Sequence, residues 1–237
     1  MTTAIILAGG MGTRLREAVP DIPKPMAPVN GKPFIQYQLD YWIKQGITQF
    51  VISVGYKKEV IMDYLGKSYR NTPLTYSVEE EPLGTGGGLL LASQQINSEI
   101  VLVMNGDTFF EVDLKTLQKY HVTKASDWTF SLFRSNENGR YKGLEMNSNG
   151  EITLLKSATD QIGKLANGGV YLVNPKILEK IPNRIGQKLS LEDELLPSLL
   201  ATGNKFTGIE FSGAFIDIGI PKDYLRAANI IPYDENK

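Results

Sequence analysis

The stretch AIILAGGMGTRLR, residues 4–16, joins a short apolar run to a turn that holds three glycines and two arginines. The apolar run is typical of a buried strand, and the glycines are typical of a chain that turns sharply after it. Three interpretations compete for such a turn: a cradle for the phosphates of a nucleotide, a dinucleotide site of the Rossmann type, or a plain connection. The spacing of the residues around it separates them.

Spacing excludes the second interpretation and also a P-loop elsewhere in the chain. A Rossmann fingerprint needs glycine at all three positions of G-x-G-x-x-G, but counted from Gly10 the third position is Leu15. Residues 66–68 end like a P-loop, yet Ile61 stands where its first glycine belongs. Backbone without Cβ can approach an anion closely, and Arg14 can fork onto phosphate oxygens. A plain turn has no use for the arginine, so the pattern favours a phosphate cradle.

The composition limits the class of protein. With 237 residues, 42% of them hydrophobic and 22% charged, the chain fits one globular domain with a proper core. The 25 Lys and Arg against 26 Asp and Glu indicate no nucleic-acid or membrane partner. The absence of cysteine and the single His121 exclude disulfides, thiolate catalysis and Cys or His metal clusters. No apolar run has signal or membrane-spanning length, so we expect a soluble, cytoplasmic protein; the oligomeric state stays open, a homo-oligomer included.

Strand-like and helix-like stretches alternate through the first half, which predicts an α/β fold. Ile35, Leu39, Trp42 and Ile43 are predicted to share the buried face of a helix over residues 32–46. In the next helix, over residues 57–66, the inward residues are predicted to be Val60, Ile61, Tyr64 and Leu65. Residues 81–87 are expected to form a loop before a third helix over 88–96. The apolar run that follows reads as a central strand, and it delivers Asp107 to the carboxyl edge of the sheet, where ligands bind in open α/β folds.

The second half is richer in short strands. Residues 141–146 and 151–156 are predicted to form a hairpin around Asn-Ser-Asn-Gly. Asp113 is predicted to be a helix N-cap, and further helices are expected to start at Ser190 and at Pro221. We find no repeat or long linker, so residues 1–237 are taken as one domain whose halves, 1–111 and 112–237, are closely joined.

Several motifs in addition to the glycine turn carry a family resemblance. They are PKP at residues 23–25, APVNGKPFIQY at 27–37, EEEPLGTGGG at 79–88, MNGD at 104–107, NGGVYLV at 167–173 and FIDIGIPKDY at 215–224. In this order they resemble the nucleotidyltransferases that join a sugar 1-phosphate to a nucleoside triphosphate, over almost the entire chain. Within that family the opening PKPMAPVNGKPF is most similar to the D-glycero-α-D-manno-heptose 1-phosphate guanylyltransferases.

The resemblance implies a fold and a reaction. The fold would be Rossmann-like, with a mixed, mostly parallel sheet flanked by helices and a small β-rich sugar-binding extension; 1–111 would bind the nucleotide and 112–237 the sugar phosphate. In the reaction a sugar phosphate oxygen attacks the α-phosphorus and pyrophosphate leaves, giving a nucleotide-sugar for surface polysaccharide synthesis. The nucleophile is already ionised, so the protein must supply positioning and positive charge, not a general base.

The residues that the family motifs assign to this chemistry form three groups. The implied catalytic residues are Arg14, on the leaving pyrophosphate, Lys24, fixed between two prolines, and Asp107. Asp107 and Asp217 would bind Mg²⁺, although Asp217 also reads as a turn or cap residue. The implied nucleotide-binding residues are Leu7, Ala8, Gly9, Gly10, Gly12, Thr13, Arg14, Lys24, Glu80, Glu81, Gly84, Thr85 and Asp107. The implied sugar-phosphate-binding residues are Gly143, Lys156, Asn167 and Gly168.

The choice of base and sugar depends on the acidic run at residues 79–81 and on the surroundings of Lys156. A carboxylate suits the two donor sites on the pairing edge of guanine, but the sequence does not say which of Glu79, Glu80 and Glu81 faces the base. Lys156 has the position of the family's phosphate-binding lysine, yet an exposed surface lysine fits the pattern equally well. Many relatives carry Glu-Lys-Pro there, whereas this chain has residues 155–157 as Leu-Lys-Ser, which is consistent with a sugar other than a hexose.

Alternative functions remain. One is the same chemistry on another pair, such as uridylyl, thymidylyl or guanylyl transfer to glucose or mannose 1-phosphate. Another is a regulatory subunit that binds nucleotide-sugars without catalysis, which would be expected to lack Arg14, Lys24 or Asp107; all three are present. An oxidoreductase using a dinucleotide is excluded by Leu15.

Overall fold

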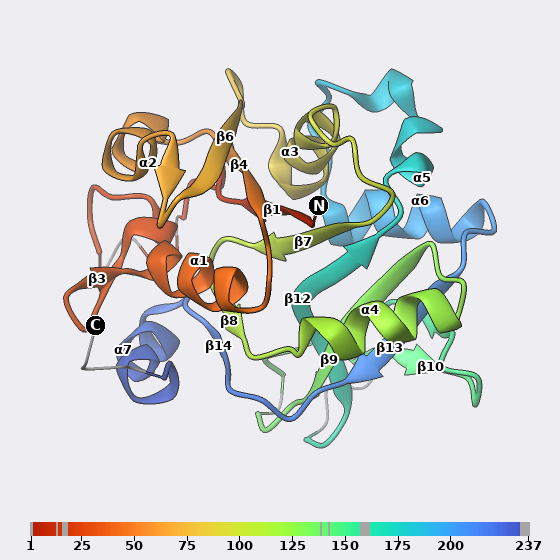
Figure 1. Cartoon of the computed structure of the whole chain (residues 1–237). Coiled ribbons are helices and arrows are strands. Elements are labelled where there is room, and N and C mark those ends of the chain that lie inside the picture. Colours follow the sequence, from red (N-terminus) through yellow and green to blue (C-terminus); the bar gives the residue numbers. More distant parts are fainter. Residues whose placement is uncertain are drawn as a thin grey trace.

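The structure is a computed structural model that describes residues 2–12, 14–15, 19–137, 139–141, 143–156 and 162–232. A central sheet of eight strands, in the order β13-β9-β12-β7-β1-β4-β6-β5, runs through the molecule (Figure 1). In chain order its strands are β1 (Thr3–Leu7), β4 (Gln49–Val54), β5 (Ser68–Tyr69), β6 (Thr72–Val78), β7 (Val101–Asn105), β9 (Trp128–Arg134), β12 (Leu165–Val173) and β13 (Phe206–Glu210).

The sheet is mixed and mostly parallel. β6, β4, β1 and β7 run parallel side by side, and β13 is parallel to β9. β12 is antiparallel to both of its neighbours, β7 and β9, and the edge strand β5 is antiparallel to β6. This arrangement confirms the predicted α/β class.

Helices cover both faces of the sheet because successive side chains of the central strands point to opposite sides. Ala4 and Ile6 of β1 belong to one hydrophobic cluster, with α1 (Phe34–Lys44), α2 (Lys58–Leu65) and α4 (Leu114–Thr123). Ile5 and Leu7 belong to the other, with α3 (Gly84–Ser93), α5 (Lys176–Glu179) and α6 (Leu196–Ala201). The last helix, α7 (Pro221–Ile230), packs in a third cluster that also holds residues of α1. The described helices all fall short of the length and apolarity that a membrane crossing requires.

Two short ribbons stand apart from the main sheet. β8 (Thr108–Phe110) pairs antiparallel with β14 (Phe215–Asp217), and β2 (Pro28–Val29) pairs with β3 (Lys32–Pro33). A third ribbon joins β10 (Glu145–Met146) to β11 (Ile152–Leu154), which confirms the predicted hairpin. The remaining elements are the short turns η1 (Lys24–Met26), η2 (Pro182–Arg184) and η3 (Leu191–Leu195), the last of π type.

The helix starts predicted from capping residues are confirmed. Asp113 accepts a hydrogen bond from the backbone N–H of Thr116 at 2.7 Å and so caps α4. The Ser190 hydroxyl accepts from the backbone N–H of Asp193 at 3.1 Å, ahead of the π turn that leads into α6. Pro221 is the first residue of α7.

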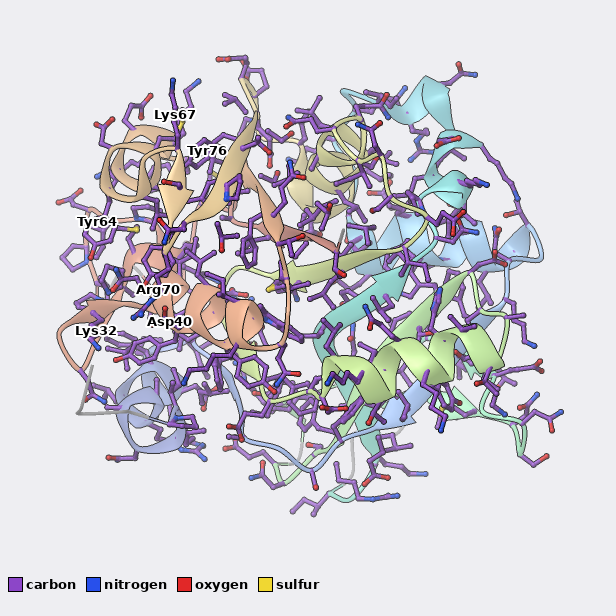
Figure 2. The ribbon with its side chains drawn as sticks, in the orientation of Figure 1. Lys32, Asp40, Tyr64, Lys67, Arg70 and Tyr76 are labelled. Carbon is purple, nitrogen blue, oxygen red and sulfur yellow. The ribbon has the colours of Figure 1, made fainter. Side chains whose placement is uncertain are left out.

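The predicted inner face of α1 is largely confirmed, whereas that of α2 is only half right. Ile61 and Leu65, one turn apart, are buried, but Tyr64 is 52% exposed and Val60 36% exposed. α2 spans eight residues beside the two-residue edge strand β5, so the sheet covers only one narrow stripe of it. Figure 2 shows Tyr64 among the other labelled side chains at this edge of the molecule.

The third helix begins inside the stretch predicted as a loop. α3 starts at Gly84, and the backbone N–H groups of Gly86 and Gly87 donate to the carbonyl of Leu189 at 2.9 and 3.2 Å. A Cβ on Gly86 would lie 3.0 Å from that carbonyl oxygen. The glycines therefore serve close packing of the helix on residues 187–191, a contact far away in sequence that local propensity does not reveal.

Candidate functional site

The glycine loop leaves the carboxyl end of β1 in the middle of the sheet. Leu7 and Ala8 are buried, and the Ala8 N–H donates to the carbonyl of Ser53 on β4 at 2.9 Å. Gly9 lies against Glu79, so that any Cβ on it would collide with the carboxylate. Gly10 has open space around its Cβ position and is exposed. The loop thus sits on the sheet edge that the sequence assigned to ligand binding, with bare backbone facing outward.

The loop also touches Lys24. Gly12 has φ +62°, and a Cβ there would lie 2.7 Å from Cγ of Lys24, so the lysine stem runs along the loop. Lys24 is the first residue of η1, and its Nζ donates to Oδ2 of Asp107 at 2.8 Å. Arg14 is exposed near the end of the loop. Thr13, the remaining loop residue assigned to the nucleotide, lies outside the described residues.

Asp107 and Asp217 are brought together by the β8–β14 ribbon. Asp217 is the register partner of Thr108, and the N–H of Ile218 donates to the carbonyl of Asp107 at 2.9 Å. Gly219 marks the meeting point. A Cβ on it would be 2.7 Å from Oδ1 of Asp217, 3.4 Å from Nζ of Lys24 and 3.6 Å from Oδ2 of Asp107. The structure therefore brings together the lysine and the two acids that the sequence placed in one site.

The carboxylates of Asp107 and Asp217 repel each other. Burial, and next the negative charge of Asp107, raise the pKa of Asp217 to about 6, against the opposing effects of the Gly219 N–H, Arg140 and Lys24. A cation beside both carboxylates would offset this repulsion. No cluster of three His, Asp or Glu occurs in the described part of the chain, but Mg²⁺ is usually held by one or two carboxylates, with water and substrate phosphates completing its shell. The residues present fit such an ion.

An arginine that the sequence motifs did not single out joins this group. Nε of Arg140 donates to Oδ2 of Asp223 at 3.0 Å, and Nη2 donates to Oδ2 of Asp217 at 3.1 Å. Asp223 is buried in the first turn of α7. Neither partner is near Arg140 in sequence, and an arginine in an irregular segment carries no pattern that would have marked it.

Arg140, which forms an ion pair with Asp217, also lines a cavity of about 260 Å³. Its lining is formed by Asn105, Phe130, Arg140, Tyr141, Leu144, Leu155, Lys156, Asn167, Glu192 and Leu196. Two of the residues assigned to the sugar phosphate, Lys156 and Asn167, therefore lie here. Gly143 bridges to Ala166 next to the cavity, and Gly168 packs so tightly that a Cβ would lie 2.5 Å from the ring of Phe110.

The polar groups of this cavity suit a polyhydroxylated ligand. Oδ1 of Asn105 is buried without a hydrogen-bond partner among the described residues, so it can accept from a hydroxyl group. Burial raises the pKa of Glu192, whose Oε2 accepts from the hydroxyl of Thr85 at 3.5 Å. Lys156 forms an ion pair with Asp193 at the rim. Glu192 is a further lining residue that the sequence did not single out, because its only local signal was a capped helix start.

The acidic loop separates its three glutamates. Glu79 is 7% exposed and accepts hydrogen bonds from the Ser53 hydroxyl at 3.0 Å and the Leu83 N–H at 2.9 Å. Burial raises its pKa against the effect of these two bonds. Glu80 and Glu81 are exposed, and Glu80 pairs with Lys58 at 3.1 Å. Glu79 thus packs against Gly9 of the glycine loop, whereas Glu80 and Glu81 face solvent.

Known proteins are similar to this chain over nearly its whole length. A family model described as "Nucleotidyl transferase" matches residues 3–233. A D-glycero-alpha-D-manno-heptose 1-phosphate guanylyltransferase of Aneurinibacillus thermoaerophilus is 41% identical over 224 residues, which are 94% of this chain and 96% of that protein. A protein of the same name from Campylobacter jejuni is 37% identical over 221 residues, 93% of this chain and 96% of that protein.

A solved structure is similar over the whole fold. The crystal structure of HddC from Yersinia pseudotuberculosis matches with a TM-score of 0.85 and 34% identity, over 97% of this chain and 99% of that one. A second structure of that protein is complexed with GMP-PN. Given the family match over nearly its full length, the chain belongs to the nucleotidyl transferase family of enzymes.

Proposed function

We propose that the protein transfers GMP from GTP to D-glycero-α-D-manno-heptose 1-phosphate, releasing pyrophosphate and forming a GDP-heptose for surface polysaccharide synthesis. The observation that carries the proposal is the convergence of Lys24, Asp107 and Asp217 beside the glycine loop. The choice of base and sugar is supported by the names of the two heptose 1-phosphate guanylyltransferases, which match almost end to end.

The reaction that fits these residues is a direct displacement. An ionised oxygen of the sugar phosphate forms a bond to the α-phosphorus of GTP, and the bond from that phosphorus to the bridging oxygen of pyrophosphate breaks. No proton has to be removed from the nucleophile, so the protein's part is to hold several negative charges together. Lys24 is proposed to face the α-phosphate, and Arg14 the β- and γ-phosphates that leave.

Magnesium is the proposed cofactor, with Asp107 and Asp217 as its protein ligands. When bound, the ion neutralises charge on the reacting phosphate oxygens and the departing pyrophosphate. The chain's own contribution is to fix both carboxylates through the β8–β14 ribbon and to keep Nζ of Lys24 2.8 Å from Oδ2 of Asp107.

Binding roles follow the two halves of the domain. We propose that residues 1–111 hold the nucleotide and residues 112–237 the sugar phosphate. The proposed nucleotide contacts are Leu7, Ala8, Gly9, Gly10, Gly12, Thr13, Arg14, Lys24, Glu80, Glu81, Gly84, Thr85 and Asp107. The proposed sugar-phosphate contacts are Gly143, Lys156, Asn167 and Gly168. Because GTP is a cytoplasmic metabolite and the chain has no cysteine, we place the reaction in the cytoplasm.

The test is pyrophosphate release by the purified protein with Mg²⁺, measured for each nucleoside triphosphate with a panel of sugar 1-phosphates. We expect the highest kcat/KM for GTP with the manno-heptose 1-phosphate. Release with no pair would refute enzymatic transfer. If UTP or dTTP serves as well as GTP, the guanine assignment is wrong, and preference for mannose or glucose 1-phosphate would make a hexose the substrate.

A further inference from the structure

Arg140 stands between the metal-binding carboxylates and the sugar cavity. Its guanidinium contacts Asp217 on one side, and its side chain lines the cavity of about 260 Å³ together with Lys156. The two cations of this lining differ in setting. The side chain of Arg140 is 16% exposed, whereas that of Lys156 is 41% exposed and pairs at the rim with Asp193. Arg140 is therefore the cation that lies deeper and closer to the reacting end of the site.

Asp223 holds the guanidinium of Arg140 in place and leaves part of its N–H donors for other partners. Nε is held by Asp223, which is 2% exposed, and the guanidinium lies 5.0 Å from the centre of the Tyr141 ring. The hydrogen bonds from Arg140 to the two carboxylates start from Nε and Nη2, and the side chain of Tyr141 is a further partner. A guanidinium carries five N–H donors, so the two on Nη1 are not engaged by either carboxylate.

We propose that Arg140 binds the phosphate group of the incoming sugar 1-phosphate, an assignment that rests on the function proposed above. Arginine matches the geometry of a phosphate through two parallel N–H bonds, and a partly buried one loses little to solvent screening. A phosphate between Arg140 and Lys24 would have its nucleophilic oxygen on the side of Asp107, where the α-phosphate of the nucleotide is expected.

The neighbouring contacts allow this exchange. Nη2 lies 3.1 Å from Oδ2 of Asp217 and 2.9 Å from Oδ2 of Asp223. When a phosphate takes Nη2 from these two oxygens, Nε can keep its bond to Asp223, so the arginine stays in place. Asp223 also has a second partner, because Nη1 of Arg226 donates to its Oδ1 at 3.4 Å. Arg226 lines a different cavity, next to Phe211 and Phe215, and so offers a matched control on the same carboxylate.

The experiment is steady-state kinetics with Mg²⁺, GTP and the heptose 1-phosphate for the wild type and the variants Arg140→Gln, Arg140→Lys and Arg226→Gln. We expect the KM for the sugar 1-phosphate to rise about tenfold to a hundredfold in Arg140→Gln, since a charge-assisted bond is lost, with the KM for GTP unchanged. Arg140→Lys should raise the KM for the sugar 1-phosphate about threefold to tenfold, because lysine keeps the positive charge but lacks the two parallel N–H donors of the guanidinium. Arg226→Gln should leave both KM values as in the wild type. Inorganic phosphate should compete with the sugar 1-phosphate less well in both Arg140 variants.

The outcomes separate this inference from the proposed function. If the wild type transfers to no sugar 1-phosphate, the proposed function fails. If the wild type is active but Arg140→Gln has the sugar KM of Arg226→Gln, or raises the KM for GTP instead, the role of Arg140 is refuted. Should thermal melting show that Arg140→Gln does not fold, Arg140→Lys decides, and an unchanged sugar KM in that variant would overturn the proposal.

Discussion

The two ends of the site hold their charges in different ways. At the carboxylate end, which comprises Lys24, Asp107, Asp217 and Gly219, the groups come from a strand end, a short ribbon and a turn between prolines, and the side chains of Lys24 and Asp107 are 15% and 27% exposed. At the sugar end, the deeper Arg140 is 16% exposed, whereas the rim pair of Lys156 and Asp193 is 41% and 64% exposed. Buried charges held by rigid elements act strongly on each other, whereas exposed ones are screened by water. Substitutions should therefore cost far more at the carboxylate end than in this rim pair.

The largest effect is expected from Asp107→Asn. Removing this charge takes away a proposed metal ligand and the partner of Lys24, so kcat should fall by about 10²–10³-fold or more while the fold persists. Pyrophosphate release measures kcat, and a thermal melt shows whether the fold persists. Asp113→Asn is the matched control, because asparagine caps a helix as well as aspartate does and Asp113 lies outside the site. Full activity in Asp107→Asn would contradict the metal assignment.

Gly219→Ala should be next in size. The new Cβ would sit 2.7 Å from Oδ1 of Asp217 and 3.4 Å from Nζ of Lys24, so it must displace one of the groups that we propose to act on the metal or the phosphates. A shift of that order typically costs tenfold or more in rate, and we expect about tenfold in kcat with little change in the KM for the sugar. An unaffected kcat would show that the close arrangement around Gly219 is not needed for turnover.

The acidity of Asp217 predicts how metal binding depends on pH. Its pKa, raised to about 6, means that a proton competes with Mg²⁺ below that pH, so the half-saturating Mg²⁺ concentration should rise as the pH falls through 6. In the metal-free protein, the raised pKa means that the folded state binds a proton at Asp217 more tightly than the unfolded state does. The free energy of unfolding should therefore decrease as the pH rises from about 4 toward 6. Rates measured against Mg²⁺ between about pH 5 and pH 8 check the first statement, and a half-saturating concentration independent of pH would contradict it.

Lys156→Gln should have the smallest effect. An exposed ion pair is worth up to about 1 kcal/mol, so we expect the KM for the sugar 1-phosphate to rise about fivefold at most. Asp193→Asn is the companion variant: if Lys156 serves the sugar phosphate, releasing it from Asp193 should leave that KM unchanged or lower it. An effect of Lys156→Gln as large as that of Asp107→Asn would break the contrast between the two ends.

The same contrast explains what could be predicted from sequence. Asp107 follows a continuous apolar run, and Lys24 stands between two prolines, so local patterns already indicated a strand end and a stiff turn near a ligand. The pairing of Asp107 with Asp217 was expected from the family resemblance, and the antiparallel β8–β14 ribbon that brings them together was not predicted. The alternating elements predicted the α/β class, and the resemblance implied the mixed, mostly parallel sheet.

The sugar end depends on contacts that no local pattern encodes. Arg140 and Asp217 are 77 residues apart, and Arg140 lies in an irregular segment. Glu192 faces the cavity because a π turn precedes α6, and Gly84 starts a helix because the backbone of residues 187–191 packs on it. The exposure of Tyr64 has the same origin, since the position of α2 at the sheet edge follows from topology and not from its own periodicity.

The most direct test offers the wild-type protein a mixture of GTP, UTP and dTTP together with D-glycero-α-D-manno-heptose 1-phosphate and mannose 1-phosphate, with Mg²⁺, and identifies the products by mass. If the loop, Lys24 and the two acids form the transfer site we describe, GDP-heptose will accumulate with an equal amount of pyrophosphate, and Asp107→Asn will yield neither. Pyrophosphate without a nucleotide-sugar, or no product at all, would contradict the account.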